Sequence, residues 1–145
     1  MPVDTSPVGK TYDAAEFEVD ADRIRAYADA VGEDDPVHRD AEAAKAAGFR
    51  DVVAPPMFAV VYSAGAMGPA IIEVIGEKLP LMVHGGQEFV WSEPVCAGDR
   101  ISTTAEVKEI YDKGDKAFYV FETRSRNQNG DEVVKATWTN IVRGG

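Results

Sequence analysis

The stretch VVAPPMFAVVYSAGAMGPAII, residues 52–72, decides the fold, because it holds no charged side chain over 21 consecutive positions. That length is sufficient to span a bilayer. Its three prolines and its run of Ser, Ala and Gly argue against a membrane span, and proline near a helix start is tolerated because the first N–H groups lack intrahelical partners. We therefore expect a fully buried core helix over about 56–75, kinked or interrupted at Gly68-Pro69.

Downstream of this stretch the apolar residues recur with a period of two, which is typical of strands. The turn sequences Asp112-Lys113-Gly114 and Asn129-Gly130 indicate hairpins. Consecutive hairpins predict an antiparallel meander, and the uncharged helix is the element apolar enough to cover one face of it. The sequence thus predicts an α+β domain, a curved antiparallel sheet wrapped around one long central helix. The expected strands lie at about 83–93, 99–111, 115–127 and 131–142.

Upstream of the uncharged stretch the pattern favours two shorter helices. Asp20 is a suitable N-cap for a helix over about 21–31, and Gly32 fits the position after its end. Asp40 is a second N-cap, for a short helix that ends at Gly48. The polar loop GEDDPVHR joins these helices, and residues 1–20 form an irregular arm with one short strand.

The length, charge and cysteine content of the chain limit the classes of protein to which it can belong. The chain has 145 residues, which we interpret as one domain, 1–145. It has 15 Lys and Arg against 25 Asp and Glu, a net charge of −10, which argues against nucleic acid as a partner. The single cysteine, Cys96, forbids an internal disulfide and fits a reducing compartment, and the N-terminus lacks an apolar signal region. We expect a cytoplasmic protein without a membrane span, a metal site or a cofactor.

Three segments together resemble a known family. They are GEDDPVH (32–38), VVAPPMF (52–58) and HGGQEFVWSEPVCAGDR (84–100). In this order they resemble the MaoC-like hot-dog dehydratases and (R)-specific enoyl-thioester hydratases, most closely the N-terminal-type MaoC dehydratase domain. The resemblance implies a hot-dog fold, a dimer of two such domains, and an acyl-CoA or acyl-carrier-protein thioester held at their interface. It also implies reversible syn addition of water to a trans-2-enoyl thioester.

The family's hydratase signature, G-D-x-N-P-[LIV]-H, assigns an acid/base pair. The chain has His38 at the histidine, Glu33 at the aspartate and Asp35 at the asparagine position. Hydration needs a group that takes a proton from water and returns one to carbon, and a histidine oriented by a carboxylate does both. Glutamate is one methylene longer than aspartate, so Asp34 or Asp35 is an alternative carboxylate. The other interpretation is a solvated acidic loop with His38 packed locally.

Further candidates concern substrate binding. A thioester enolate needs a hydrogen-bond donor, and the position that supplies an N–H in the family holds Pro56, which has none. The Met57 N–H at the helix start is the nearest substitute. His84, beside two glycines at a strand start, is a second polar candidate with a structural alternative. The aromatic residues that line an acyl pocket, or else pack in the core, are Phe58, Tyr62, Phe89 and Trp91.

Three functions stay open. The first is a (3R)-hydroxyacyl-thioester dehydratase or enoyl-thioester hydratase, which uses His38 with Glu33. The second is a non-catalytic acyl-binding subunit that pairs with a second MaoC-like chain, favoured by Glu33 and Pro56. The third is a hot-dog thioesterase, by analogy of fold alone. An edge strand and an apolar flank predict a homodimer or a heterodimer. Cations for an anionic carrier would come from a partner chain or from Arg39, Arg50 or Arg100.

Overall fold

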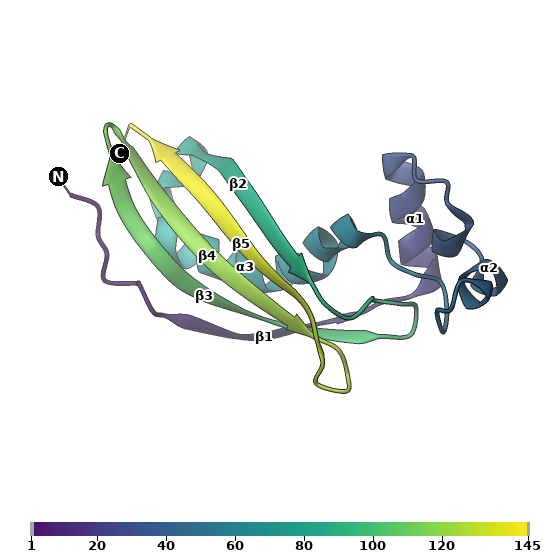
Figure 1. Ribbon diagram of the computed structural model, residues 1–145. Coiled ribbons are helices and arrows are strands. Elements are labelled where there is room, and N and C mark those ends of the chain that lie inside the picture. The colour runs from purple at the N-terminus through teal and green to yellow at the C-terminus, as the bar shows by residue number, and fades with distance from the viewer. Residues whose placement is uncertain (1, 145) are drawn as a thin grey trace.

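The computed structural model describes residues 2–144 as a five-stranded antiparallel sheet that curves around one long helix (Figure 1). Two short helices stand apart at one end of the sheet. The predicted α+β class and the central helix are therefore confirmed. The strands are β1 (Thr11–Glu18), β2 (Met82–Trp91), β3 (Arg100–Lys113), β4 (Lys116–Arg126) and β5 (Glu132–Arg143). The helices are α1 (Ala21–Val31), α2 (Ala41–Ala46) and α3 (Ala59–Ile75), with the 3₁₀ turns η1 (Pro36–His38), η2 (Pro56–Phe58) and η3 (Gly76–Leu81).

The strand order, β1-β3-β4-β5-β2, corrects the expected meander of four consecutive strands. Only β3, β4 and β5 follow one another as hairpins, while β2 pairs with β5 at the far edge and β1 with β3. The segment between β2 and β3 is too long and too rich in turn residues for a hairpin. It contains Pro94 and crosses to the helical end, where Cys96 forms a bridge with Val53. The irregular arm also contains a full strand of eight residues, β1.

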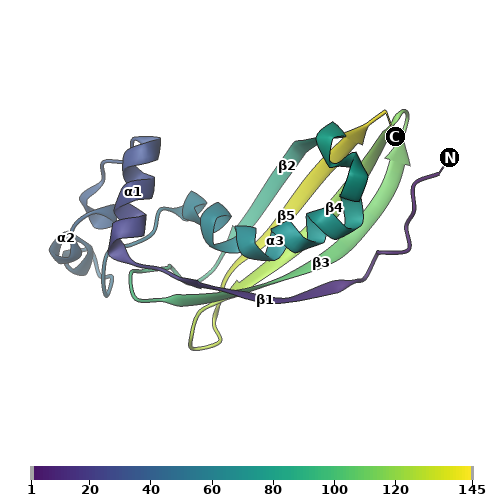
Figure 2. The same ribbon diagram turned by 180° about the vertical axis from the view of Figure 1, so that it is seen from behind.

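Helix α3 lies across the concave face of the sheet (Figure 2) and contacts β1, β3 and β4. By length and composition, Pro56–Leu81 is apolar enough to cross a membrane, and 44% of its most apolar window is buried in this fold. The expectation of a helix buried on all sides is wrong. The sheet covers one face only, and the other exposes Val60 at 38%, Val61 at 37% and Ile72 at 65%.

Pro69 does not interrupt α3, which runs unbroken over 17 residues. The expected interruption is therefore wrong. A proline removes one N–H and crowds one preceding carbonyl, so its cost falls on one turn. The close contact between the small helix residues and the sheet keeps that turn in place. A Cβ added at Gly65, for example, would lie 3.4 Å from the Cβ of Ala15 on β1.

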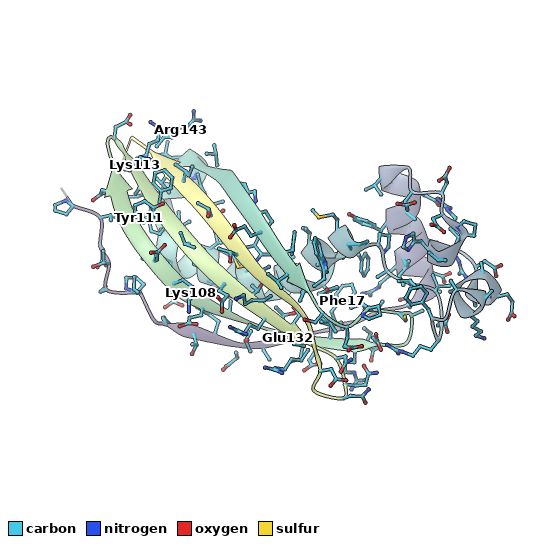
Figure 3. All side chains as sticks on the ribbon, in the orientation of Figure 1. Phe17, Lys108, Tyr111, Lys113, Glu132 and Arg143 are labelled. Carbon is cyan, nitrogen blue, oxygen red and sulfur yellow. The ribbon has the colours of Figure 1, made fainter. Side chains whose placement is uncertain are left out.

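Helices α1 and α2, which form the helical end of the molecule, begin after the predicted N-cap residues. The Asp20 carboxylate accepts from the Arg23 N–H at 2.7 Å, and α1 ends at Gly32, whose φ of 73° favours glycine. Asp40 caps α2 through the Glu42 N–H at 3.2 Å. In Figure 3, Phe17 and Glu132 lie toward this end, whereas Tyr111, Lys113 and Arg143 lie at the opposite end of the sheet. The loops of the helical end are thus the segments placed to build a pocket beside the start of α3.

Candidate functional site

An apolar pocket of about 370 Å³ opens where the helical end meets the sheet. Most of its lining comes from the end of η1, the stretch before α3, the end of β2 and the loop after it, with single residues from α3, from β5 and from the loop after α2. Its lining residues include Val37, His38, Phe49, Val53, Pro55, Pro56, Tyr62, Trp91, Glu93 and Val95. His38 and Glu93 are the titratable groups of the lining other than Tyr62, and the described lining holds no lysine or arginine. The pocket therefore suits an uncharged acyl group.

His38 is the predicted acid/base residue that this pocket contains. Its Nδ1 lies 2.7 Å from the carbonyl oxygen of Val53. Because a carbonyl only accepts, Nδ1 carries the proton, and Nε2 of the neutral ring is left as the acceptor. The Val53 segment is itself fixed, since the Val53 N–H donates to the Val37 carbonyl at 2.9 Å. The ring is therefore oriented by backbone and not by a carboxylate.

The acidic residues of the predicted signature lie outside the pocket lining. The Glu33 carboxylate accepts from the Asp35 N–H at 3.2 Å, and Asp35 accepts from the Val37 N–H at 3.1 Å. Asp35 thus caps η1, while Asp34 is exposed. The Glu33 carbonyl accepts two hydrogen bonds from the Arg39 guanidinium, at 3.0 and 2.6 Å. These contacts shape the loop that presents His38, and the structure does not bring a carboxylate of this loop to the ring.

The start of the central helix forms the pocket wall through Pro55 and Pro56. The Pro56 carbonyl accepts from the Trp91 indole N–H at 3.1 Å, which ties the helix start to the end of β2. Met57, the predicted substitute donor, does not line the pocket, and its side chain is 47% exposed. Within residues 2–144 its N–H has no hydrogen-bond acceptor. The described wall therefore presents a carbonyl and two prolines where the family signature expects an N–H.

Tyr62 and Phe58 take different positions. Tyr62 lines the pocket and is 3% exposed, and burial raises the pKa of its phenol. Phe58 is 1% exposed and lies behind Tyr62, with their ring centroids 6.1 Å apart. It also packs edge-on against Phe17 and Tyr27. Phe58 is thus a core residue that supports the pocket wall, and Tyr62 is the wall itself.

His84 lies far from this pocket along the edge strand. It is exposed on β2, seven residues before Trp91, and its ring packs edge-on against Trp138 at 6.2 Å. The ladder between β2 and β5 has a bulge between His84 and Gly86. A Cβ at Gly85 would lie 2.4 Å from Ile141 Cδ1, so the strand packs too closely there for a side chain.

Arg50, whose side chain is half-exposed, pairs with Asp99, a residue that was not among the predicted site residues. The Asp99 carboxylate, fully buried, accepts from Arg50 Nη1 at 2.6 Å and Nη2 at 2.7 Å. It also accepts from the Cys96 N–H and from Gln128. Burial would raise the pKa of this carboxyl, but those donors outweigh it, so the pKa lies below its ordinary value. In the sequence, the signal for this ion pair was the turn Ala97-Gly98-Asp99, while the arginine that binds Asp99, Arg50, lies in a distant segment.

The three candidate cations for an anionic carrier are all engaged elsewhere. Arg39 pairs with Asp29 at 2.6 Å, and Arg100 with Glu18 at 2.8 Å. Arg50 is held by Asp99, as described above. None of the three lines the pocket in the described part of the chain. Cys96 is buried, and burial raises the pKa of its thiol.

Comparison with known proteins identifies the family. Residues 6–136 match the family model described as "FAS1-like, dehydratase domain region". The chain is 40% identical to a UPF0336 protein of Saccharopolyspora erythraea, over 99% of this chain and 94% of the relative. It is 38% identical to a UPF0336 protein of Streptomyces coelicolor, over 98% and 95%.

Solved structures agree with this assignment. The HadBC (3R-hydroxyacyl-ACP dehydratase) complex of Mycobacterium tuberculosis superposes with a TM-score of 0.85 and 25% identity, covering 94% of this chain and 98% of that one. The (R)-hydratase PhaJ1 of Pseudomonas aeruginosa gives 0.72 and 25%, covering 100% and 90%. The resemblance to MaoC-like dehydratases and the hot-dog fold is thereby confirmed. The chain belongs to the FAS1-like dehydratase-domain family.

Proposed function

We propose that the chain is a hydro-lyase subunit that interconverts (3R)-hydroxyacyl and trans-2-enoyl thioesters, with the acyl group in the pocket beside His38. The observation that carries the proposal is the oriented imidazole in an otherwise apolar cavity. Its Nδ1 is held by the Val53 carbonyl at 2.7 Å, which leaves Nε2 as the acceptor. The substrate is an acyl-CoA or acyl-carrier-protein thioester, and the protein acts as a dimer in the cytoplasm. The similarity to a (3R-hydroxyacyl-ACP dehydratase) complex and to an (R)-hydratase supports it.

One acid/base group is sufficient for both proton transfers of the reaction. His38 Nε2 takes a proton from water while the water oxygen bonds to C3 of the enoyl group. The electron pair of the C2=C3 bond moves to C2 and the thioester carbonyl, and the imidazolium then protonates C2. Dehydration runs through the same steps in reverse. Syn addition follows because one imidazole on one face of the substrate performs both proton transfers.

A second candidate function is that of an acyl-binding subunit without its own chemistry. The contacts of the signature loop favour it, because Glu33 and Asp35 use their carboxylates within the loop. Pro56 also presents no N–H toward the pocket. In that case a second MaoC-like chain supplies the acid/base pair. The complex of two chains named in the HadBC structure supports this alternative.

The test is loss of enoyl absorbance when the pure protein is mixed with a short trans-2-enoyl-CoA. His38→Asn is the informative variant, because its amide nitrogen can still donate to the Val53 carbonyl while Nε2 is gone. We expect the hydration rate to fall by about a hundredfold or more, with unchanged thermal unfolding. An inactive wild type that binds enoyl-CoA as tightly as His38→Asn does would support the acyl-binding function instead. Release of free thiol would indicate a thioesterase.

A further inference from the structure

The hydroxyl of Tyr62 is the polar group of the pocket wall that has no partner. Tyr62 lines the pocket and is 3% exposed. Burial alone raises the pKa of its phenol, and no hydrogen bond from residues 2–144 contributes to that change. Buried hydroxyls in proteins are almost always hydrogen-bonded, because an unpaired one costs stability. The partner of this hydroxyl is therefore supplied by what fills the pocket.

The Tyr62 side chain covers the start of the central helix. Tyr62 lies in the first turn of α3, which begins at Ala59. An aromatic side chain in a helix points back toward the N-terminus, over the residues three and four positions before it. The distance of 6.1 Å between the ring centroids of Tyr62 and Phe58 agrees with this direction. The hydroxyl is thus directed to the part of the wall that Pro55 and Pro56 form.

This part of the wall lacks a backbone donor where an enolate needs one. Pro56 has no N–H, and the indole N–H of Trp91 is engaged by the Pro56 carbonyl at 3.1 Å. The N-terminal end of a helix nevertheless favours negative charge, because its unpaired N–H groups are partly positive. A donor placed here by a side chain therefore acts in a favourable field.

Two hydroxyls belong to the described lining, those of Tyr62 and Ser92. Ser92 follows the end of β2 and is exposed, so water competes for its hydroxyl. A hydrogen bond inside the apolar wall is stronger, because the local dielectric constant is lower. Tyr62 is thus better placed than Ser92 to stabilise charge on a bound substrate.

Burial also keeps the phenol neutral. A phenolate is disfavoured in an apolar wall, and no nearby charge offsets the rise in the pKa of Tyr62. Tyr62 therefore keeps its proton over the pH range in which a histidine such as His38 exchanges one. The two residues can thus divide the work, with His38 moving protons and Tyr62 donating a hydrogen bond.

We infer that the Tyr62 hydroxyl donates a hydrogen bond to the carbonyl oxygen of the thioester and stabilises the enolate of the reaction. This inference rests on the proposed function for its substrate. When water adds at C3, the electron pair of the C2=C3 bond moves through C2 onto the carbonyl oxygen, and it returns when His38 protonates C2. The hydroxyl hydrogen stays on Tyr62 throughout. A side chain thereby supplies the donor that the backbone lacks at Pro56.

The first test removes a single oxygen atom. For Tyr62→Phe we expect kcat for hydration of a short trans-2-enoyl-CoA to fall about a hundredfold, with KM changed by less than about threefold. Tyr27→Phe is the matched control, because Tyr27 packs edge-on against the same Phe58 but does not line the pocket. It should leave both constants unchanged. A Tyr62→Phe protein that hydrates as fast as the wild type overturns the inference.

Two further measurements on Tyr62→Phe separate a donor from a structural or a titrating group. Its thermal unfolding should not be lowered, since the hydroxyl has no partner within the described chain, and a clear fall would show a structural role instead. The ratio of wild-type to variant rates should stay constant between about pH 6 and pH 9, because a neutral phenol does not titrate there. A ratio that changes with pH would make Tyr62 a proton carrier and overturn the inference.

A spectroscopic readout does not need turnover. A short saturated acyl-CoA, isotopically labelled at the thioester carbonyl, cannot be hydrated, and infrared difference spectroscopy reports the carbonyl stretch when it is bound. Because a hydrogen bond lowers this frequency, we expect the band to move to higher frequency in Tyr62→Phe. In His38→Asn and Ser92→Ala it should stay at the wild-type position.

The spectroscopic outcomes distinguish this inference from the proposed reaction. A band that moves in Tyr62→Phe while the wild type is inactive would refute the hydro-lyase proposal and support Tyr62 as the donor of an acyl-binding subunit. A band that is unmoved in Tyr62→Phe, or that moves in Ser92→Ala instead, overturns the inference even if the wild type is active. A wild type that binds no acyl-CoA overturns both.

Discussion

Two carboxylate-bearing segments flank the same pocket and behave in opposite ways. The loop 32–38 has three acidic residues in a row, all of them at least partly exposed, and their visible contacts are to the loop's own backbone. The turn 96–99 has one, Asp99, which is fully buried and accepts four hydrogen bonds. The loop resembles a catalytic signature, yet the turn holds the pocket together. The number of charges in a segment is thus a poor guide to what each charge does.

The connection from Asp99 to His38 runs through the backbone. Asp99 forms two hydrogen bonds with Arg50. The segment that follows Arg50 is also hydrogen-bonded to the segment before Asp99. The Ala97 N–H donates to the Val52 carbonyl and the Ala54 N–H to the Val95 carbonyl, both at 2.8 Å. Between these two bonds lies the Val53 carbonyl that orients His38. The turn therefore fixes the partner of the imidazole, and the loop fixes the imidazole itself.

The largest expected effect comes from removing the arginine that pairs with the buried Asp99 carboxylate. Arg50→Ala leaves Asp99 buried with only two of its four hydrogen bonds, so we expect a loss of about 3 kcal/mol in the free energy of unfolding. Urea denaturation followed by tryptophan fluorescence measures it. Arg100→Ala is the matched control, because its pair with Glu18 is exposed on both sides and should change stability by less than about 0.5 kcal/mol. Equal effects of the two variants would show that the turn has no special role.

The next effect concerns pH. Because the pKa of Asp99 is lower in the folded chain than in the unfolded one, its stabilising contribution is complete above about pH 4 and is lost as the pH falls through the folded value. The wild type should therefore lose stability more steeply than Asp99→Asn as the pH falls below about 4. Thermal unfolding at a series of pH values tests this. Parallel curves for the two proteins would contradict the assignment.

A smaller effect is expected at the cap of η1. Asp35→Ala removes the acceptor of the Val37 N–H, and loss of a cap costs about 1 kcal/mol. Because η1 ends at His38, we also expect a raised KM for the enoyl thioester with a smaller change in kcat. Asp35→Asn keeps an acceptor and should restore both values. A failure of that rescue would mean that the charge at this position acts directly.

The smallest effect is predicted for Glu33→Gln. The amide keeps an oxygen acceptor for the Asp35 N–H, so stability should change by less than about 0.5 kcal/mol. If the loop carboxylates are structural, the hydration rate should also stay within a factor of about two, because the amide keeps the contact that shapes the loop. A hundredfold loss, equal to that of His38→Asn, would place Glu33 in the chemistry and erase the difference between loop and turn.

The sequence predicted most of the architecture because its signals are local. Caps, period-two strands and an uncharged helix each depend on neighbouring residues, and Asp20, Asp40 and α3 occur where expected. The position of β2 was not predictable in this way, because strand order depends on contacts between residues far apart in the chain. The exposed face of α3 was missed for the same reason, since an uncharged helix has the same composition whether its second side meets this chain or another.

For the site, the residue types were predictable but not their partners. His38 and Tyr62 line one pocket as the motifs suggested, and their roles stay predictions. The partner of His38 is a backbone carbonyl, which no side-chain motif can reveal. Asp99 was visible only as part of a turn, because burial of its carboxylate depends on Arg50 and Gln128 arriving from two other segments.

The contact of Gly85 with Ile141 has a consequence for how this edge strand behaves before any partner arrives. Sliding β2 along β5 by two residues would bring Val83 or Gln87 to the place where a Cβ lies 2.4 Å from Ile141 Cδ1, so the Ile141 side chain would have to move. Such a shift is therefore disfavoured, although the strand is apolar and open, a combination that otherwise invites disordered aggregation. Gly85 thus favours the observed alignment of β2 with β5, and with it the same exposed edge in each folded chain.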